Sequence, residues 1–365
     1  MISAGITTTA YGNNFGEMLQ AFGIRAAVNS LPGCQAELVN FSTKAYHPYQ
    51  KPGFESFAAK NVQKNKLFQE FRENELGLSN QPVSELTQEN APDFDVYVFG
   101  SDGIWNTSVW EVPEFFGSFV PTGKPKIAYS PSVGADPNGA LLKREMFEKY
   151  IPSFDYLSVR ERMHMEFVQQ YAAPGKRVHL VCDPTLLHPR QTYEALAAKG
   201  QEPPKPDRPY IFFYQPHAAD CAILSLVVKL ARRFGYDVVH TFADIPSSVF
   251  PHESISARFA GPREFLSYIR DAALVITRSY HAAIFSILFE RPMYAFVDKK
   301  SGSRFVSLLS TLHMEDRLVY NFLRPEEASP EYDYTDALNN LADFKMSSME
   351  YLKDALYGAS RGLDN

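Results

Sequence analysis

Short apolar runs that end in glycine or a small polar residue alternate with segments of helical periodicity along most of this chain. The runs Asp95–Gly100 and Leu274–Thr277 are apolar almost throughout, which is typical of parallel strands buried on both faces. The segment Phe15–Asn29 carries apolar residues at helical spacing. Strands that alternate with helices build a parallel sheet covered by helices. We therefore expect an α/β fold of the doubly wound, Rossmann-like type.

A proline-rich segment, residues 200–209, divides this alternation into two similar halves. Proline cannot continue a helix, so the segment is interpreted as a linker. The 365 residues suffice for two separate cores. We expect an N-terminal α/β domain over 1–199, a C-terminal α/β domain over 210–342, and a last helix in 343–365 that packs back on the first domain. Ligands of such folds bind beyond the carboxyl ends of the strands, so two facing domains predict a cleft between them.

The charge and the cysteine content exclude several classes of function. The net charge is −6 and no run of Lys or Arg stands out, which argues against nucleic-acid binding. The three cysteines form no CxxC pair, so we expect neither a disulfide framework nor a metal site. The sequence shows no secretory leader and no apolar run of bilayer length. We expect a cytoplasmic protein without a transmembrane segment, and peripheral membrane contact stays open.

The strongest candidate site is the segment Thr277–His281. Arg278, Ser279 and His281 directly follow a strand of the buried type, where α/β folds bind their ligands. Ser279 is suited to cap the next helix, and His281 falls in its first turn, beside the positive end of the helix dipole. A lone histidine is usually structural, but three such side chains at one strand end favour a functional site.

A second polar motif follows the strand Asp95–Gly100. Ser101 and Asp102 come directly after its glycine. The Asp102 carboxylate could act as a general base toward a substrate hydroxyl, and helix capping is its structural alternative. Trp105 is interpreted as a core residue. For Asp102 we favour the functional interpretation.

Two further segments place cations or free backbone N–H groups at helix starts. Asn14 and Gly16 lie in the turn before the first helix, where N–H groups attract anions, although an ordinary Asn cap explains them equally well. Lys300, Ser303 and Arg304 surround the start of another helix and form a candidate phosphate contact. Solvated surface charges are the alternative for each of these cations.

Arg160 follows the predicted strand Tyr156–Val159 and precedes Glu161. A planar guanidinium suits carboxylates and phosphates. Taken alone, this residue is explained better by an ion pair with Glu161 or by a surface position.

At these motifs the chain resembles the polysaccharide pyruvyl transferase family. Each motif is short, and their common order and spacing make the match specific. The matching stretches are Asn14–Gly16 with Leu19–Ala21, Asp95–Asn106, Ile127–Gly134, Ser158–Glu161, Asp183–Leu187, Gly261–Pro262, Phe265–Leu266, Thr277–His281, and Ser303–Arg304 with Leu308–Leu309.

The resemblance implies a two-domain, GT-B-like fold, with the acceptor on the N-terminal side and the donor on the C-terminal side. It implies transfer of pyruvate from phosphoenolpyruvate onto two hydroxyls of a sugar in a surface polysaccharide or its lipid-linked precursor, as in exopolysaccharide or capsule biosynthesis. A cyclic ketal forms, phosphate leaves, and no cofactor is needed. The implied catalytic residues are His281, Asp102 and Arg160. The implied substrate-binding residues are Arg278, Ser279, Arg304, Ser303, Lys300, Asn14, Gly16, Ser101 and Ser132.

Two alternatives remain at this point. A glycosyltransferase of the same GT-B architecture would use a nucleotide sugar, and fold alone does not separate the two enzymes. A non-catalytic glycan-binding relative would keep the fold without the reaction. The acceptor sugar, and whether it is lipid-linked or free, stay open as well.

Overall fold

The computed structural model describes residues 1–43, 61–79, 81–109, 111–134, 139, 141–216, 218–297 and 302–361. Its first half holds a four-stranded parallel sheet in the order β2-β1-β3-β4, which a single bridge from Ile127 to Tyr156 extends to the pair β5-β6. The strands are β1 Ile2–Thr7, β2 Cys34–Leu38, β3 Val96–Phe99, β4 Lys126–Ala128, β5 Leu157–Val159 and β6 Val178–Leu180.

The second half holds a six-stranded sheet in the order β12-β11-β10-β7-β8-β9, and every pairing in it is parallel. Its strands are β7 Tyr210–Tyr214, β8 Asp237–His240, β9 Ser254–Ser256, β10 Leu274–Thr277, β11 Met293–Phe296 and β12 Leu318–Val319. The four central strands are buried along their whole length. Both sheets therefore confirm the predicted α/β fold class.

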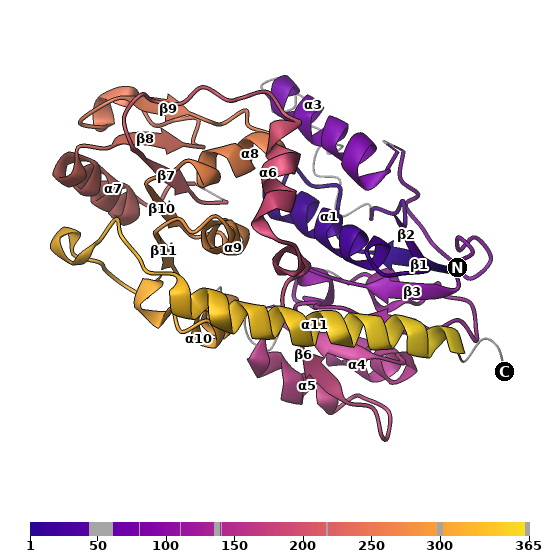
Figure 1. The fold of residues 1–365 in the computed structure, drawn as a ribbon. Helices are drawn as coiled ribbons and strands as arrows, with labels where there is room; N and C mark the ends of the chain where they lie inside the picture. Colours follow the sequence, from indigo (N-terminus) through magenta and orange to yellow (C-terminus); the bar gives the residue numbers. More distant parts are fainter. Residues whose placement is uncertain are drawn as a thin grey trace.

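Helices connect the strands and pack against the two sheets (Figure 1). They are α1 Phe15–Asn29, α3 Val62–Phe71, α4 Arg144–Tyr150, α5 Met165–Gln169, α6 Arg190–Ala198, α7 Cys221–Phe234, α8 Pro262–Arg270, α9 Tyr280–Leu288, α10 Gly302–Thr311 and α11 Thr335–Arg361. Asn14, Asp220 and Ser279 cap α1, α7 and α9 by accepting hydrogen bonds from backbone N–H groups.

Apolar runs in the sequence also predict strands over Ile127–Ser132, Val178–Cys182 and Tyr210–Tyr214, and helical spacing predicts helices within Tyr46–Leu78 and over Arg160–Tyr171. Several of these elements differ from the structure. The predicted strand Ile127–Ser132 ends at Ala128, because Ser130 takes a positive φ of 58°. The predicted helix Arg160–Tyr171 begins instead as a 3₁₀ turn at Arg162–His164 before α5. Of the helices predicted over Tyr46–Leu78, α3 is described, whereas residues 44–60 lie outside the described part.

Helix α11 runs along both halves of the molecule, and its last turns lie near the N-terminus (Figure 1). It starts at Thr335, before the predicted Asp343. Its Tyr351 hydroxyl donates to the carbonyl of Ala128 at 2.9 Å, and its Ser348 hydroxyl accepts from the Cys182 N–H at 2.9 Å. These bonds tie α11 to the last residue of β4 and to the loop that follows β6.

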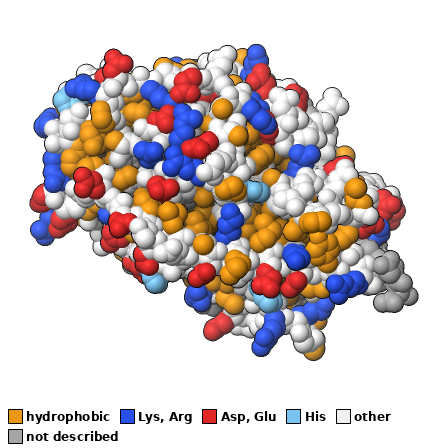
Figure 2. All heavy atoms as spheres, viewed as in Figure 1, with side chains coloured by type: hydrophobic (Ala, Val, Ile, Leu, Met, Phe, Trp, Pro, Cys, Tyr) orange, Lys and Arg blue, Asp and Glu red, His pale blue; other side chains and the backbone are white. Residues whose placement is uncertain are grey.

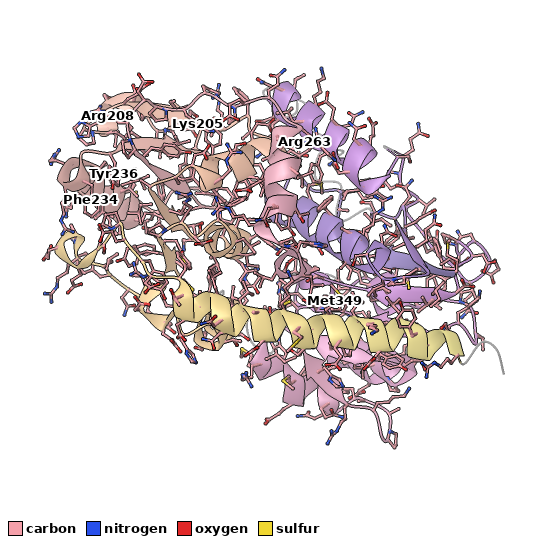
Figure 3. All side chains as sticks on the ribbon, viewed as in Figure 1. Lys205, Arg208, Phe234, Tyr236, Arg263 and Met349 are labelled. Atoms are coloured by element: carbon pink, nitrogen blue, oxygen red, sulfur yellow. The ribbon has the colours of Figure 1, made fainter. Side chains whose placement is uncertain are left out.

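The two halves also touch through side chains. Phe15 of α1 stacks on Phe265 of α8 with ring centroids 4.4 Å apart. Arg263, which lies between α6 and α3 in Figure 3, donates to the Glu75 carboxylate at 2.7 Å. Residues 200–209 contain no helix or strand, and the predicted domain limits stay a prediction.

The surface of this face mixes positive and negative side chains without a broad area of one sign (Figure 2). None of the helices in the described part is both long and apolar enough to span a bilayer.

Candidate active site

The polar motifs of both halves meet at the carboxyl ends of the strands. Asp102 follows β3, Arg160 follows β5 and Asp183 follows β6, whereas His281 lies in the first turn of α9, after β10. Parallel strands bring their carboxyl ends to one edge of a sheet, and the two edges face each other here. Ion pairs connect all four side chains.

Arg160 is enclosed by three carboxylates. Its Nη1 lies 2.7 Å from Oδ2 of Asp183, its Nε 3.2 Å from Oε1 of Glu161, and its Nη2 3.6 Å from Oδ1 of Asp102. The side chain is 1% exposed. Burial by itself would lower the pKa of Arg160, but these carboxylates raise it well above its usual value. The charge of the guanidinium is therefore balanced within the protein. The ion pair with Glu161, which the sequence favoured for Arg160 taken alone, is present, and Asp183 and Asp102 add to it.

His281 joins this cluster through the same carboxylate oxygen. Its Nε2 lies 3.4 Å from Oδ2 of Asp183, the atom that also accepts from Arg160. Thr185 donates to the other oxygen of Asp183 from its N–H and its hydroxyl. Burial would raise the pKa of Asp183, but His281 and then Arg160 hold it well below its usual value. The buried carboxylate of Asp183 therefore links Arg160 of the first half with His281 of the second.

Gly16 provides the space for this imidazole. A Cβ atom on Gly16 would lie 2.1 Å from Nδ1 of His281, so any side chain here would collide with the ring. The Gly16 N–H donates to Oδ1 of Asn14 at 2.9 Å. The predicted anion-binding turn is therefore a capped helix start that packs against His281, as the alternative interpretation held.

Asp102 is the carboxylate of the cluster that reaches solvent. Its side chain is 16% exposed, whereas Glu161 and Asp183 are fully buried. Its backbone has φ 64° and ψ −167°, a conformation that residues other than glycine rarely adopt. The N–H of Ser132 donates to its carbonyl at 2.7 Å and helps to hold this conformation. Strain of this kind is common at functional sites.

Three of the predicted substrate-binding serines form hydrogen bonds within the protein. Ser101 is fully buried, and its hydroxyl donates to the carbonyl of Ser130 at 2.9 Å. Ser132 is buried beside Glu161 and forms a side-chain hydrogen bond with it. Ser279 is occupied as the cap of α9. The hydroxyl oxygens of these three serines already form hydrogen bonds within the protein, so the serines stabilise the loops that carry them.

Tyr280 lies between two arginines. Its buried ring is 4.6 Å from the guanidinium carbon of Arg160 and 5.8 Å from that of Arg304. Burial and the nearby charge of Arg160 lower the pKa of Arg304. Arg304 is half-buried, and no carboxylate in the described part of the chain forms an ion pair with it. Arg304 is therefore the cation of this site that an incoming anion could engage.

Three predicted substrate-binding residues remain: Arg278, Lys300 and Ser303. Arg278 places Nη1 3.4 Å from Oδ2 of Asp220, at the start of α7. Lys300 falls outside the described residues. Ser303, in the first turn of α10, lines a cavity of about 820 Å³ where the halves meet, together with Arg162 and Met163 from the first half and Gly302 and Tyr320 from the second.

The sequence matches the family model described as polysaccharide pyruvyl transferase over residues 14–299. The chain belongs to this family. Membership of this family indicates that the protein is a transferase that acts in polysaccharide pyruvylation. The match includes Asp102, Arg160, Asp183 and His281, whereas Arg304 lies beyond it.

The pyruvyl transferase also resembles solved structures in fold. The UDP-GlcNAc 2-epimerase from Neisseria meningitidis bound to UDP-GlcNAc superposes with a TM-score of 0.51 at 9% identity, covering 100% of this chain and 99% of that one. The ADP-heptose LPS heptosyltransferase II from E. coli has a TM-score of 0.39 at 11% identity, with 98% and 99% covered. The first of these supports the predicted GT-B-like arrangement of two Rossmann-like halves. No curated protein sequence matches the chain significantly.

Sequence reasoning assigned no role to two members of this candidate site, Asp183 and Tyr280, and named Glu161 only as an ion-pair partner of Arg160. Asp183 carried a usable signal, because it follows a predicted strand as Asp102 does. Nothing in the sequence indicated that one oxygen of Asp183 serves both Arg160 and His281. Among the described residues, no group of three His, Cys, Asp or Glu side chains could hold a metal ion.

Proposed function

We propose that this pyruvyl transferase moves pyruvate from phosphoenolpyruvate onto two hydroxyls of one sugar, in a surface polysaccharide or its lipid-linked precursor. The observation that carries the proposal is the shared Oδ2 of Asp183, which pairs with Arg160 of the first half and with His281 of the second. A histidine close to a buried carboxylate is suited to hold and deliver a proton at the place where the two halves meet.

The proposed reaction balances without a cofactor. One sugar hydroxyl adds its oxygen to carbon 2 of the donor, while carbon 3 takes up a proton and becomes a methyl group. The second hydroxyl then attacks carbon 2, and the phosphate leaves with the last proton. Two hydroxyl protons are consumed, one by the methyl group and one by the phosphate, and a cyclic ketal remains.

Each step has a candidate group on the chain. His281 is the acid that protonates carbon 3, because its Nε2 lies 3.4 Å from the buried carboxylate of Asp183, where the two halves meet. Asp102 is the carboxylate with access to solvent and takes the proton of the attacking hydroxyl. Arg304 binds an anionic group of the donor, since no carboxylate of the described residues forms an ion pair with it. Arg160 positions Asp102, Glu161 and Asp183.

Binding of the donor is tested by thermal unfolding with phosphoenolpyruvate. A ligand at one hundred times its Kd adds about 2.7 kcal/mol of stability, which corresponds to a rise in Tm of several degrees. UDP-GlcNAc at equal concentration should leave Tm unchanged. A shift with UDP-GlcNAc and none with phosphoenolpyruvate would replace the proposal with a nucleotide-sugar transferase.

Catalysis is tested with His281→Asn, which keeps a polar side chain but removes the titratable ring. We expect phosphate release from phosphoenolpyruvate, with glycosides that carry two free hydroxyls, to fall by 10²-fold or more. The Tm shift with the donor should persist. His313→Asn is the matched control, because His313 is exposed and its φ of 56° suits asparagine. Equal turnover of His281→Asn and wild type would remove His281 from the mechanism.

A further inference from the structure

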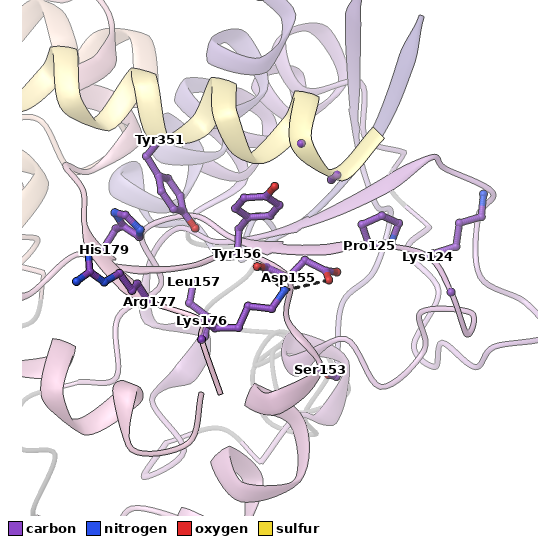
Figure 4. A pocket seen from close by; sticks show the side chains of 14 residues that line it. Lys124, Pro125, Ser153, Asp155, Tyr156, Leu157, Lys176, Arg177, His179 and Tyr351 are labelled. Atoms are coloured by element: carbon purple, nitrogen blue, oxygen red, sulfur yellow. Dashed lines mark hydrogen bonds and ion pairs between the residues drawn. The ribbon is translucent and has the colours of Figure 1, made fainter. Parts of the chain in front are cut away.

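A second cavity of about 720 Å³ lies at the amino ends of β4, β5 and β6 (Figure 4). Pro125, Tyr156 and Arg177 precede these strands and line it, and Tyr351 and Gly358 of α11 close one side. Cavities of this volume are in the range that holds small ligands.

The cavity is separate from the active site. Tyr156 and Arg160 stand at opposite ends of β5, and four residues of strand span about 13 Å. None of the residues in the ion-paired cluster lines the cavity. A ligand bound there would therefore leave the reacting groups free.

Two tyrosine rings form fixed walls of the cavity. The Tyr351 hydroxyl is held by the carbonyl of Ala128, and its ring packs on His179 with centroids 5.1 Å apart. Tyr156 passes directly beneath α11, where a Cβ on Gly358 would lie 2.0 Å from its hydroxyl. Rings that are held in this way present apolar faces without further loss of side-chain entropy on binding.

The cavity carries an excess of positive charge. Lys176 is anchored by the backbone carbonyl of Asp155 at 3.0 Å and by its carboxylate at 3.5 Å (Figure 4). Lys124 lies at the rim and pairs with Asp93. Arg177 is exposed, and within the described part of the chain no carboxylate forms an ion pair with it. This local excess contrasts with the net charge of −6 of the whole chain.

We propose that this cavity binds an acidic saccharide. The tyrosine faces accept sugar rings, and Arg177 with Lys176 accepts carboxylates, for which the arginine fork is suited. The choice of ligand rests on the proposed function, since pyruvylation puts carboxylates on the glycan. The site would hold a charged segment of the glycan away from the reacting groups.

The test uses tetragalacturonate, an acidic oligosaccharide, titrated calorimetrically into the full chain. The double variant Lys176→Ala/Arg177→Ala should weaken its binding tenfold or more, and so should Tyr156→Leu. The control Lys229→Ala/Arg232→Ala removes the same charge from the exposed face of α7 and should bind like wild type. Binding should also weaken as salt is raised, because screening reduces exposed charge pairs.

Three results would overturn the proposal. The first is equal binding of tetragalacturonate by wild type and Lys176→Ala/Arg177→Ala. The second is equal affinity for maltotetraose, which has no carboxylate. The third is that inorganic phosphate binds as tightly as tetragalacturonate and that Tyr156→Leu does not change the affinity for phosphate. His281→Asn should keep the binding, so a failure of the proposed reaction is distinguishable from a failure of this site.

Discussion

Single side chains decide how charge is distributed in the active site. The positive charge of Arg160 is balanced by ion pairs with Asp183, Glu161 and Asp102. Arg304 forms no ion pair with a carboxylate of the described residues. A guanidinium that lies over an aromatic ring and forms no ion pair with a carboxylate of the described residues is well placed to bind an anion. The donor-binding role of Arg278 stays a prediction, and the structure pairs this residue with Asp220.

A comparison of Arg304→Ala with Arg278→Ala separates these two residues. We expect Arg304→Ala to raise the KM for phosphoenolpyruvate at least tenfold, because a charged hydrogen bond contributes about 1.5–3 kcal/mol. Arg278→Ala should raise it less, since Asp220 already shares that charge. Steady-state kinetics with varied donor measures both values. A larger effect at Arg278 than at Arg304 would contradict this assignment.

At the scale of elements, α11 supports the loop that carries Asp183. Ser348 accepts from the N–H of Cys182, the residue before Asp183, and donates to the carbonyl of Phe344 at 2.6 Å. Ser348 is fully buried, whereas Ser347 beside it is exposed. The helix therefore positions a carboxylate of the candidate active site from a distant part of the chain.

Ser348→Ala should leave the buried N–H of Cys182 without an acceptor and lower the free energy of unfolding by about 1–3 kcal/mol. Ser347→Ala is the matched control and should change it by less than about 0.5 kcal/mol. Denaturant unfolding followed by circular dichroism measures both. Equal stabilities would show that the bond between α11 and the loop is dispensable.

At the scale of the whole molecule, the buried carboxylates where the two halves meet make the stability of the fold depend on pH. Arg160, together with His164 and Ser132, outweighs the effect of burial and lowers the pKa of Glu161 to about 2. Asp183 is held below its usual value as well. A carboxylate with a lowered pKa stabilises the fold above its unfolded pKa, and this contribution is lost as pH falls through the folded pKa.

We therefore expect the contribution of these carboxylates to the free energy of unfolding to be almost constant above about pH 5. It should fall as the pH is lowered from roughly 4.5 to 2, because the carboxylates take up protons. Glu161→Gln should be less stable at pH 7 by roughly 3–5 kcal/mol, because it leaves Arg160 short of a buried partner. Its stability should also decline less steeply with acid. An equally steep decline in both proteins would show that Glu161 does not govern the transition.

The sequence by itself determined the α/β class, the positions of strands such as β7 and β10, and the place of His281 at a strand end. These features follow from local periodicity and from the parallel sheet that it implies. Only the tertiary structure decided that Arg160 is enclosed by carboxylates and that Asp183 pairs with His281. The reason is that these contacts join residues far apart in the chain, and their distances depend on how two sheets and α11 pack together.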